Sequence, residues 1–127
     1  MKENFVLEDL EIYQSSLKIG EIIWITVMKW KYFERKTLGE QLVRAVDSIA
    51  ANIAEGYGRF FYKDRKQFCY YSRGSLMETK TWITKAHARK LISEDEFEEL
   101  IGQLKSLHMK LNTYIKKLKE NSATSNI

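Results

Sequence analysis

Apolar side chains recur at intervals of three and four residues through most of the chain, the period of an α-helix with one buried face. Four segments show this pattern, and we expect helices at about residues 9–30, 37–56, 64–90 and 94–119. The repeating positions in these four segments, with small and polar members in the third, are Leu10, Tyr13, Leu17, Trp24 and Met28; Leu38, Leu42, Ala45, Ile49 and Ile53; Phe68, Tyr71, Ser75, Thr79, Trp82 and Ala86; and Phe97, Leu100, Leu104, Leu107, Leu111, Tyr114 or Ile115, and Leu118.

Signals for helix ends separate the four segments. Gly56 and Gly58 follow the second segment, where a left-handed residue would end a helix at little energetic cost. Helices joined by short connections fold back on one another, so the sequence predicts an all-α, antiparallel up-down four-helix bundle. Capping-box spacing, with a side chain that accepts from the backbone three residues on, occurs at Thr37 with Glu40, Asp64 with Gln67, and Ser93 with Glu96.

Length and composition agree with a single helical domain. The chain has 127 residues, of which 44% are apolar, enough to build one core. It has no proline and six glycines, and this argues against a turn-rich β-sandwich or barrel. We expect one domain over residues 1–119 and a frayed polar tail over residues 120–127, which lack periodicity.

The first predicted helix is apolar on nearly every face over residues 22–28. A helix in a bundle needs one buried stripe, so the additional apolar side chains require another cover. One interpretation is a wide contact with the core, under the loop formed by the residues in the thirties. The other, which we favour, is an interface between subunits.

The second predicted helix carries a line of polar side chains beside its apolar stripe. The line steps by three or four residues and so follows one face of the helix. It is rich in amide and hydroxyl groups, which suit a hydrogen-bonded network between helices or subunits; the alternative is a solvated face. Its members are Gln41, Arg44, Ser48, Asn52 and Glu55.

Basic charge is concentrated in residues 57–90, which hold nine basic and two acidic side chains in a chain of net charge +4. The same segment is dense in aromatic rings. Basic groups neutralise phosphates and rings stack on unpaired bases, so the combination indicates RNA or other nucleic acid. Alternatively, the rings pack the connection onto the bundle and the basic groups are only solvated. The predicted phosphate contacts are Arg59, Lys63, Arg65, Lys66 and Arg73, with Phe61 or Tyr62 as stacking partners.

The sequence lacks the motifs of the common enzyme classes: it has no GxxxxGK[ST] phosphate loop, no GxGxxG and no HExxH. We therefore expect no catalytic residues, cofactor or metal. The single cysteine, Cys69, permits no internal disulfide, and its position beside Phe68 and Tyr70 favours a half-buried, unreactive thiol. A weaker hypothesis is a small-ligand or metal pocket at a subunit junction that uses His87 or His108.

Signals for secretion or membrane insertion are also missing. The first residues are acidic rather than basic and apolar, and the longest apolar run is far shorter than the ~20 residues of a membrane-spanning helix. We expect a cytoplasmic protein with no membrane partner.

Several blocks of residues closely resemble a known bacterial family, the 23S rRNA intervening-sequence proteins, also called four helix bundle proteins. The resemblance covers residues 5–118. It implies an antiparallel bundle that assembles as a ring, commonly a homopentamer, with no established biochemical activity. The matching blocks are residues 9–14, 41–45, 48–56 followed by Gly58 and Arg59, Phe68, 74–76 with Glu78, and 92–94.

The chain departs from the family pattern at two connections, with Glu34 where proline is frequent and Lys90 where glycine is common. A related group, the accessory variability determinant proteins of diversity-generating retroelements, forms a similar barrel that binds nucleic acid and a reverse transcriptase. The sequence thus predicts a non-enzymatic, oligomeric bundle that binds RNA or another nucleic acid. The alternative is a protein-interaction scaffold without nucleic-acid binding.

Overall fold

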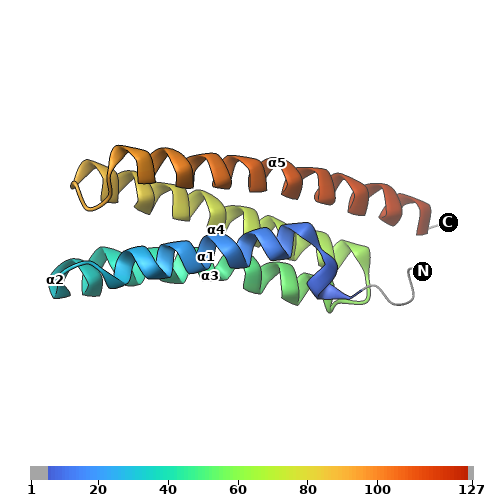
Figure 1. Cartoon of the computed structure of the whole chain (residues 1–127). Helices are drawn as coiled ribbons and strands as arrows, with labels where there is room; N and C mark the ends of the chain where they lie inside the picture. Colours follow the sequence, from blue (N-terminus) through green and yellow to red (C-terminus); the bar gives the residue numbers. More distant parts are fainter. Residues whose placement is uncertain (1–5, 126–127) are drawn as a thin grey trace.

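The chain forms four long helices that run up and down along a common axis (Figure 1). The computed structural model describes residues 6–125, with side chains described through residue 121. A 3-10 turn (Leu7–Asp9) precedes α1 (Glu11–Met28), and α2 (Tyr32–Glu34) with a π-helical turn (Arg35–Gly39) leads into α3 (Glu40–Tyr57). The chain continues through α4 (Tyr62–Ala88) and α5 (Glu94–Ser125). Helices α1 and α4 each pack against both α3 and α5, and the predicted fold class is confirmed.

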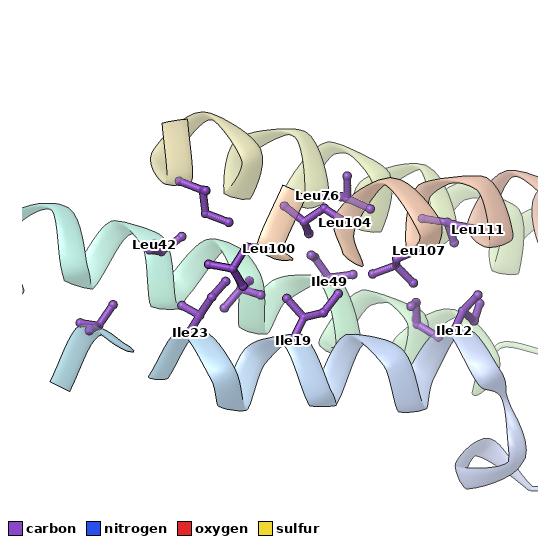
Figure 2. Close-up of a cluster of buried hydrophobic side chains, with 14 of the residues drawn as sticks. Ile12, Ile19, Ile23, Leu42, Ile49, Leu76, Leu100, Leu104, Leu107 and Leu111 are labelled. Atoms are coloured by element: carbon purple, nitrogen blue, oxygen red, sulfur yellow. The ribbon is translucent and has the colours of Figure 1, made fainter. Parts of the chain in front are cut away.

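Each of the four long helices turns a stripe of aliphatic side chains toward the bundle axis. Figure 2 shows these side chains meeting between the ribbons, with Ile23 of α1 beside Leu100 of α5 and Ile19 of α1 toward Leu104 and Leu107. Burial of apolar area, at about 25 cal/mol per Å², is the main favourable term in the stability of such a core. The core fixes the rotation of each helix and thereby decides which side chains reach the surface.

The buried stripes of α3 and α5 are the predicted ones, whereas those of α1 and α4 lie elsewhere. In α1 the buried positions include Ile12, Ile19 and Ile23, while the predicted Leu17, Trp24 and Met28 are about half exposed. Because α1 is apolar on several faces, its sequence fits more than one rotation. In α4 the expected stripe is shifted by about one position, as only Thr79 and Ala86 of its members are buried. The buried residues of α4 are Cys69, Ser72, Leu76, Thr79, Ile83 and Ala86.

The second helical segment begins five residues earlier than predicted. Lys31 has extended backbone and caps a helical path that is continuous from residue 32 to 57. Thr37 is therefore inside the helix and caps nothing; its hydroxyl donates to the carbonyl of Phe33 at 2.8 Å. In the π-helical turn, a Cβ on Gly39 would lie 2.7 Å from Cγ1 of Val27 in α1. The absence of a side chain at Gly39 therefore lets this turn pack closely against α1.

Two other predicted helix caps are wrong, although α3 ends at Tyr57, one residue beyond its predicted end. Gly56 is buried within α3, and neither it nor Gly58 has a positive φ. A Cβ on Gly56 would lie 2.9 Å from Cβ of Phe68 and 3.0 Å from the carbonyl oxygen of Arg65, so this glycine serves close packing against α4. Asp64 lies inside the first turn of α4, and its capping role belongs to the extended backbone of Phe61.

The turn between α4 and α5 combines a predicted cap with an unusual backbone conformation. The Ser93–Glu96 capping box is confirmed: the Ser93 amide donates to Glu96 Oε1 at 2.8 Å, and the Glu96 amide to Ser93 Oγ at 3.1 Å. Lys90 has a φ of 62°, in the left-handed region. The amide of Lys90 donates to the carbonyl of His87 and that of Leu91 to Ala86, the two bonds of a Schellman motif. The side chain at 90 is therefore held in the conformation that glycine adopts most easily.

Helix α5 extends beyond its predicted end near residue 119. It continues to Ser125, and residues 126–127 lie outside the described part of the chain. The prediction of a frayed tail relied on the loss of apolar periodicity. The helix nevertheless continues through residues 120–125, which include no proline or glycine that would end it. Packing and helix formation therefore end at different residues.

Candidate nucleic-acid interface

The five predicted phosphate contacts fall at one end of the bundle, around the connection from α3 to α4. Arg59 follows α3 directly, and Lys63, Arg65, Lys66 and Arg73 occupy the first half of α4. This end also carries the Leu7–Asp9 turn and the end of α5, whereas α2 and the α4–α5 turn lie at the opposite end (Figure 1). Sequence proximity thus becomes spatial proximity, but the five side chains do not share one role.

Arg59 and Arg65 stabilise the α3–α4 connection. The guanidinium of Arg59 pairs with Glu55 at 2.8 Å and lies 4.7 Å from the ring centre of Phe68. The Nε of Arg65 donates to the backbone oxygen of Arg59 at 2.7 Å, and its guanidinium lies 5.5 Å from the ring centre of Tyr62. Charge-assisted hydrogen bonds and cation–π contacts hold both groups in place, so they are less available to phosphates.

Arg73 links α4 to α5. Its Nη1 donates to Oδ1 of Asn112 at 2.7 Å, and the guanidinium lies 5.0 Å from the centre of the Tyr70 ring. These contacts join residues 39 positions apart, and a scan of local sequence does not reveal them. Arg73 is half-buried and acts within the chain as a tie between helices.

Four other residues at this end are more available: Phe60, Phe61 and Lys63 are exposed, and Lys66 is half-buried. The ammonium groups of Lys63 and Lys66 form no hydrogen bond or ion pair within the part of the chain that the structure describes. Phe60 and Phe61 are 85% and 63% exposed and meet edge to face, with ring centres 4.9 Å apart. These four residues, hereafter the turn surface, are what the basic segment offers to a ligand. Tyr62 is half-buried beside Arg65, so Phe61 is the better placed of the two predicted stacking partners.

The polar line of α3 hydrogen-bonds along its own helix. The hydroxyl of Ser48 donates to the carbonyl of Arg44 at 2.9 Å, and Nδ2 of Asn52 donates to that of Ser48 at 2.9 Å. Glu55 pairs with Arg59, while Gln41 and Arg44 are exposed. Within one chain these side chains form no network between helices, as far as the described residues show. A role between subunits stays a prediction.

The hydroxyl that does connect α3 and α4 belongs to Ser72, which the sequence analysis did not single out. Ser72 is fully buried, and its Oγ donates to the backbone oxygen of Ile49 at 2.8 Å. The small and polar members noted in the third segment hinted at such close approach. The residue itself was missed because the stripe was placed about one position away.

The exposed apolar side chains of α1 form a second surface. Trp24 and Ile25 are 49% and 56% exposed, and Met28 is half exposed as well. The core of a single chain therefore does not cover them, although Ile23 and Val27 on the same helix are buried. A groove of about 570 Å³ lies between α1 and α3, with Trp24 and Met28 among its walls.

The groups considered for chemistry occupy structural positions. The Nε2 atom of His87 lies 2.7 Å from Oε1 of Glu94, and the imidazole stacks on Phe97 with ring centres 4.1 Å apart. Burial raises the pKa of the Cys69 thiol to about 11, so the protonated and less reactive form dominates at neutral pH. Among the described residues, no group of three or more His, Cys, Asp or Glu side chains could hold a metal ion. None of the described helices has an apolar stretch long enough to cross a bilayer.

The fold matches a known crystal structure. A protein of unknown function from the S23 ribosomal protein family of Bacteroides thetaiotaomicron superimposes with a TM-score of 0.75 at 19% sequence identity, over 83% of this chain and 98% of that one. At this identity the likeness establishes the fold alone. A comparison with curated proteins finds no match.

The sequence itself establishes the family. The family described as 23S rRNA-intervening sequence protein matches residues 8–113, which include α1, α3, α4 and most of α5. This agrees with the resemblance carried by the short blocks of residues in α1, α3 and α4. The chain therefore belongs to the 23S rRNA-intervening sequence protein family.

Proposed function

We propose that this protein is a non-enzymatic, self-associating four-helix bundle that binds RNA or another nucleic acid. The observation that carries the proposal is the turn surface, where two exposed rings adjoin two unpaired ammonium groups on the most basic helix. Lysines attract phosphates, and exposed rings offer faces to unpaired bases. In this proposal Lys63 and Lys66 make the phosphate contacts and Phe60 or Phe61 stacks.

The test is a fluorescence-anisotropy titration of a labelled structured RNA and a matched DNA, each at low and near-physiological salt. Lys63→Glu combined with Lys66→Glu should weaken binding and lower the slope of log affinity against log salt by about one per lost phosphate contact. Arg65 is left unchanged because its replacement would disturb the α3–α4 connection. The matched control is Lys116→Glu with Lys117→Glu, the same charge change on exposed positions of α5.

The outcomes separate clearly. Weakened binding in the turn-surface variant but not in the α5 control supports the proposal. Equal affinity of both variants and wild type would exclude the turn surface, and no binding by the wild type even at low salt would exclude the function.

Self-association is proposed through the exposed face of α1. Trp24, Ile25 and Met28 leave an apolar surface that is unusual for a monomeric helix, and α1 keeps its own buried stripe. Sedimentation velocity of Trp24→Glu with Ile25→Glu should show a smaller species than wild type. Met109→Glu, at an exposed apolar position of α5, is the control. A wild type that sediments as a monomer at all concentrations would contradict this.

A second candidate function is a protein-interaction scaffold. It is favoured by Tyr32 and Phe33 in α2, which are strongly exposed and would offer apolar anchors to a partner. Salt distinguishes the two functions, because phosphate contacts weaken steeply as salt rises whereas apolar interfaces change little.

A further inference from the structure

A basic groove lies between α3 and α4 at the end of the bundle that carries α2, away from the turn surface. It encloses about 400 Å³ and receives basic side chains from three elements: Lys36 from the π-helical turn, Arg44 from α3, and Lys85 and Arg89 from α4. No pattern in the sequence joins these four residues. The fold brings them to one concave surface.

The aromatic wall of this groove is Trp82. On α4, Trp82, Lys85 and Arg89 are spaced by three and four residues and so share one face of the helix. Trp82 is half-buried and packs partly on the core, while its indole N–H points toward a Glu78 carboxylate oxygen at 3.4 Å. The ring is thereby held by its neighbours, which reduces the entropy lost when a planar ligand stacks on it.

The charge of the groove is unbalanced. Its one acidic lining residue, Glu40, pairs with Lys36 at 2.8 Å. The hydrogen bond from Lys36, with the charges of Lys36 and Arg44, holds the pKa of Glu40 below its ordinary value. The side chains of Lys85 and Arg89 have no hydrogen bond or ion pair among the residues that the structure describes. Arg44, Lys85 and Arg89 thus line the groove with Trp82, and the one carboxylate of the lining is paired with Lys36.

Compensation of the helix dipole does not explain this arrangement. Basic side chains near the C-terminus of α4 do interact favourably with its dipole, and Lys85 and Arg89 lie there. Arg44, however, lies near the N-terminus of a different helix, α3, where the dipole does not favour a cation, and it enters the same groove. A dipole effect also requires no tryptophan between the cations.

We propose that the groove binds one nucleotide of a single-stranded nucleic acid, with the base against Trp82 and the adjoining phosphates on Arg44, Lys85 and Arg89. The volume fits a ligand of this size, since small-molecule sites measure ~300–1,000 Å³. A duplex does not fit the chemistry, because paired bases present no free face for stacking. The proposal rests on the proposed nucleic-acid binding but assigns a different site and selects unpaired strands.

The experiment measures binding of a labelled six-nucleotide adenylate RNA, the same strand in a duplex, and adenosine monophosphate. Wild type should prefer the single strand to the duplex. Trp82→Leu should lower affinity for the strand by about 5- to 150-fold, the range of one lost stacking contact, while Trp82→Phe should retain most of it. Strand binding should also quench tryptophan fluorescence in wild type, and this quenching should be lost in Trp82→Phe.

Because Trp82 packs partly on the core, surface variants provide a second test. Lys85→Glu with Arg89→Glu changes two exposed side chains and should lower affinity for the strand at least tenfold. The Lys116→Glu, Lys117→Glu variant is the control for net charge. Circular dichroism of each variant establishes that the helices are intact.

The outcomes also separate this proposal from the proposed function. Binding that is lost in the groove variants and retained in the control supports the groove. If only the turn-surface variant weakens binding, the groove proposal is overturned while the proposed function stands. If wild type binds no nucleic acid at low salt, both fail. Tighter binding of adenosine monophosphate than of the strand would overturn the assignment to a strand.

Discussion

The two ends of the α3–α4 face both hold basic and aromatic residues but use them differently. Around the α3–α4 connection, Arg59 and Arg65 contact backbone, carboxylate and rings of the same chain. At the α2 end, Lys85 and Arg89 enter a groove without committed partners. The first end contains the densest run of basic residues in the sequence, but its arginines already contact groups of the same chain.

This difference shows that net charge locates a basic helix without identifying its available cations. An arginine that contacts rings and a carbonyl contributes to the long-range field of the protein, yet binding a phosphate would mean giving up those contacts. A lysine or arginine at a groove loses mainly hydration. Availability therefore depends on the intramolecular partners of each group, and these partners can be tested separately at each end.

The largest expected effect is at Gly56, where α3 packs closely against α4. Gly56→Ala places a Cβ 2.9 Å from Phe68 Cβ and 3.0 Å from a backbone oxygen of α4, so the helices must separate. We expect the free energy of unfolding to fall by about 2 kcal/mol. Urea denaturation measures this. Gly74→Ala, in open space on α4, is the control and should stabilise by about 0.5–1 kcal/mol through helix propensity. Equal effects of the two changes would contradict the close contact.

The next effect distinguishes the arginines of the two ends. Arg65→Ala removes the hydrogen bond to Arg59 and the contacts with Tyr57 and Tyr62, and should destabilise by about 1 kcal/mol. The rate of thiol labelling of Cys69 at pH 8 is a second measurement. Burial raises the pKa of this thiol to about 11, so labelling requires opening of the structure and should be faster in Arg65→Ala. If the labelling rate and the urea midpoint of unfolding were both unchanged, the contacts of Arg65 would contribute nothing to stability.

A third effect, of opposite sign, concerns the turn at the groove end. Lys90 has a φ of 62°, where a side chain costs energy that glycine avoids. Lys90→Gly should raise the free energy of unfolding by about 0.5–1 kcal/mol, a value reduced by the greater freedom of glycine in the unfolded chain. Thermal and urea unfolding should agree on this increase. Lys90→Ala serves as the control, since it removes the charge without relieving the backbone and should give no comparable gain.

The smallest expected effect is at the groove cations. Lys85→Ala with Arg89→Ala should change the free energy of unfolding by less than about 0.5 kcal/mol, because these exposed side chains have no partners in the described chain. Paired denaturation curves of this variant and Arg65→Ala compare the two ends directly. A loss as large as that for Arg65→Ala would show that the groove cations also act within the fold.

The sequence predicts the bundle well where apolar residues occur on only one face. In α5, leucines at Leu100, Leu104 and Leu107 define one stripe, and all three are buried as expected. The predicted rotation of α1 was wrong because this helix has apolar residues on more than one face. The sequence does not show whether Trp24 and Met28 or Ile23 face the core, and the packing of the whole bundle decides this. Helix ends were predicted correctly at the Ser93 capping box, where the signal is local.

The candidate sites depended more strongly on three-dimensional contacts. The charge count identified α4, but the partners of Arg65 and Arg73 are a backbone carbonyl and a residue of α5. Neither partner carries a sequence signal. The groove likewise unites residues about 40 to 50 positions apart, and only the antiparallel alignment of α3 with α4 brings Arg44 beside Lys85.

The up-and-down path returns the first and last residues that the structure describes to the end of the bundle opposite the groove (Figure 1). Helix α4 has 27 residues and is therefore ~40 Å long, so the two ends of the bundle lie about that far apart. A fluorescent protein, an affinity tag or a solid support joined to either terminus would therefore stand well clear of the groove and close to the turn surface. Attachment chemistry thus becomes a steric probe: a bulky fusion should hinder ligands at one end of the molecule while leaving the other end open.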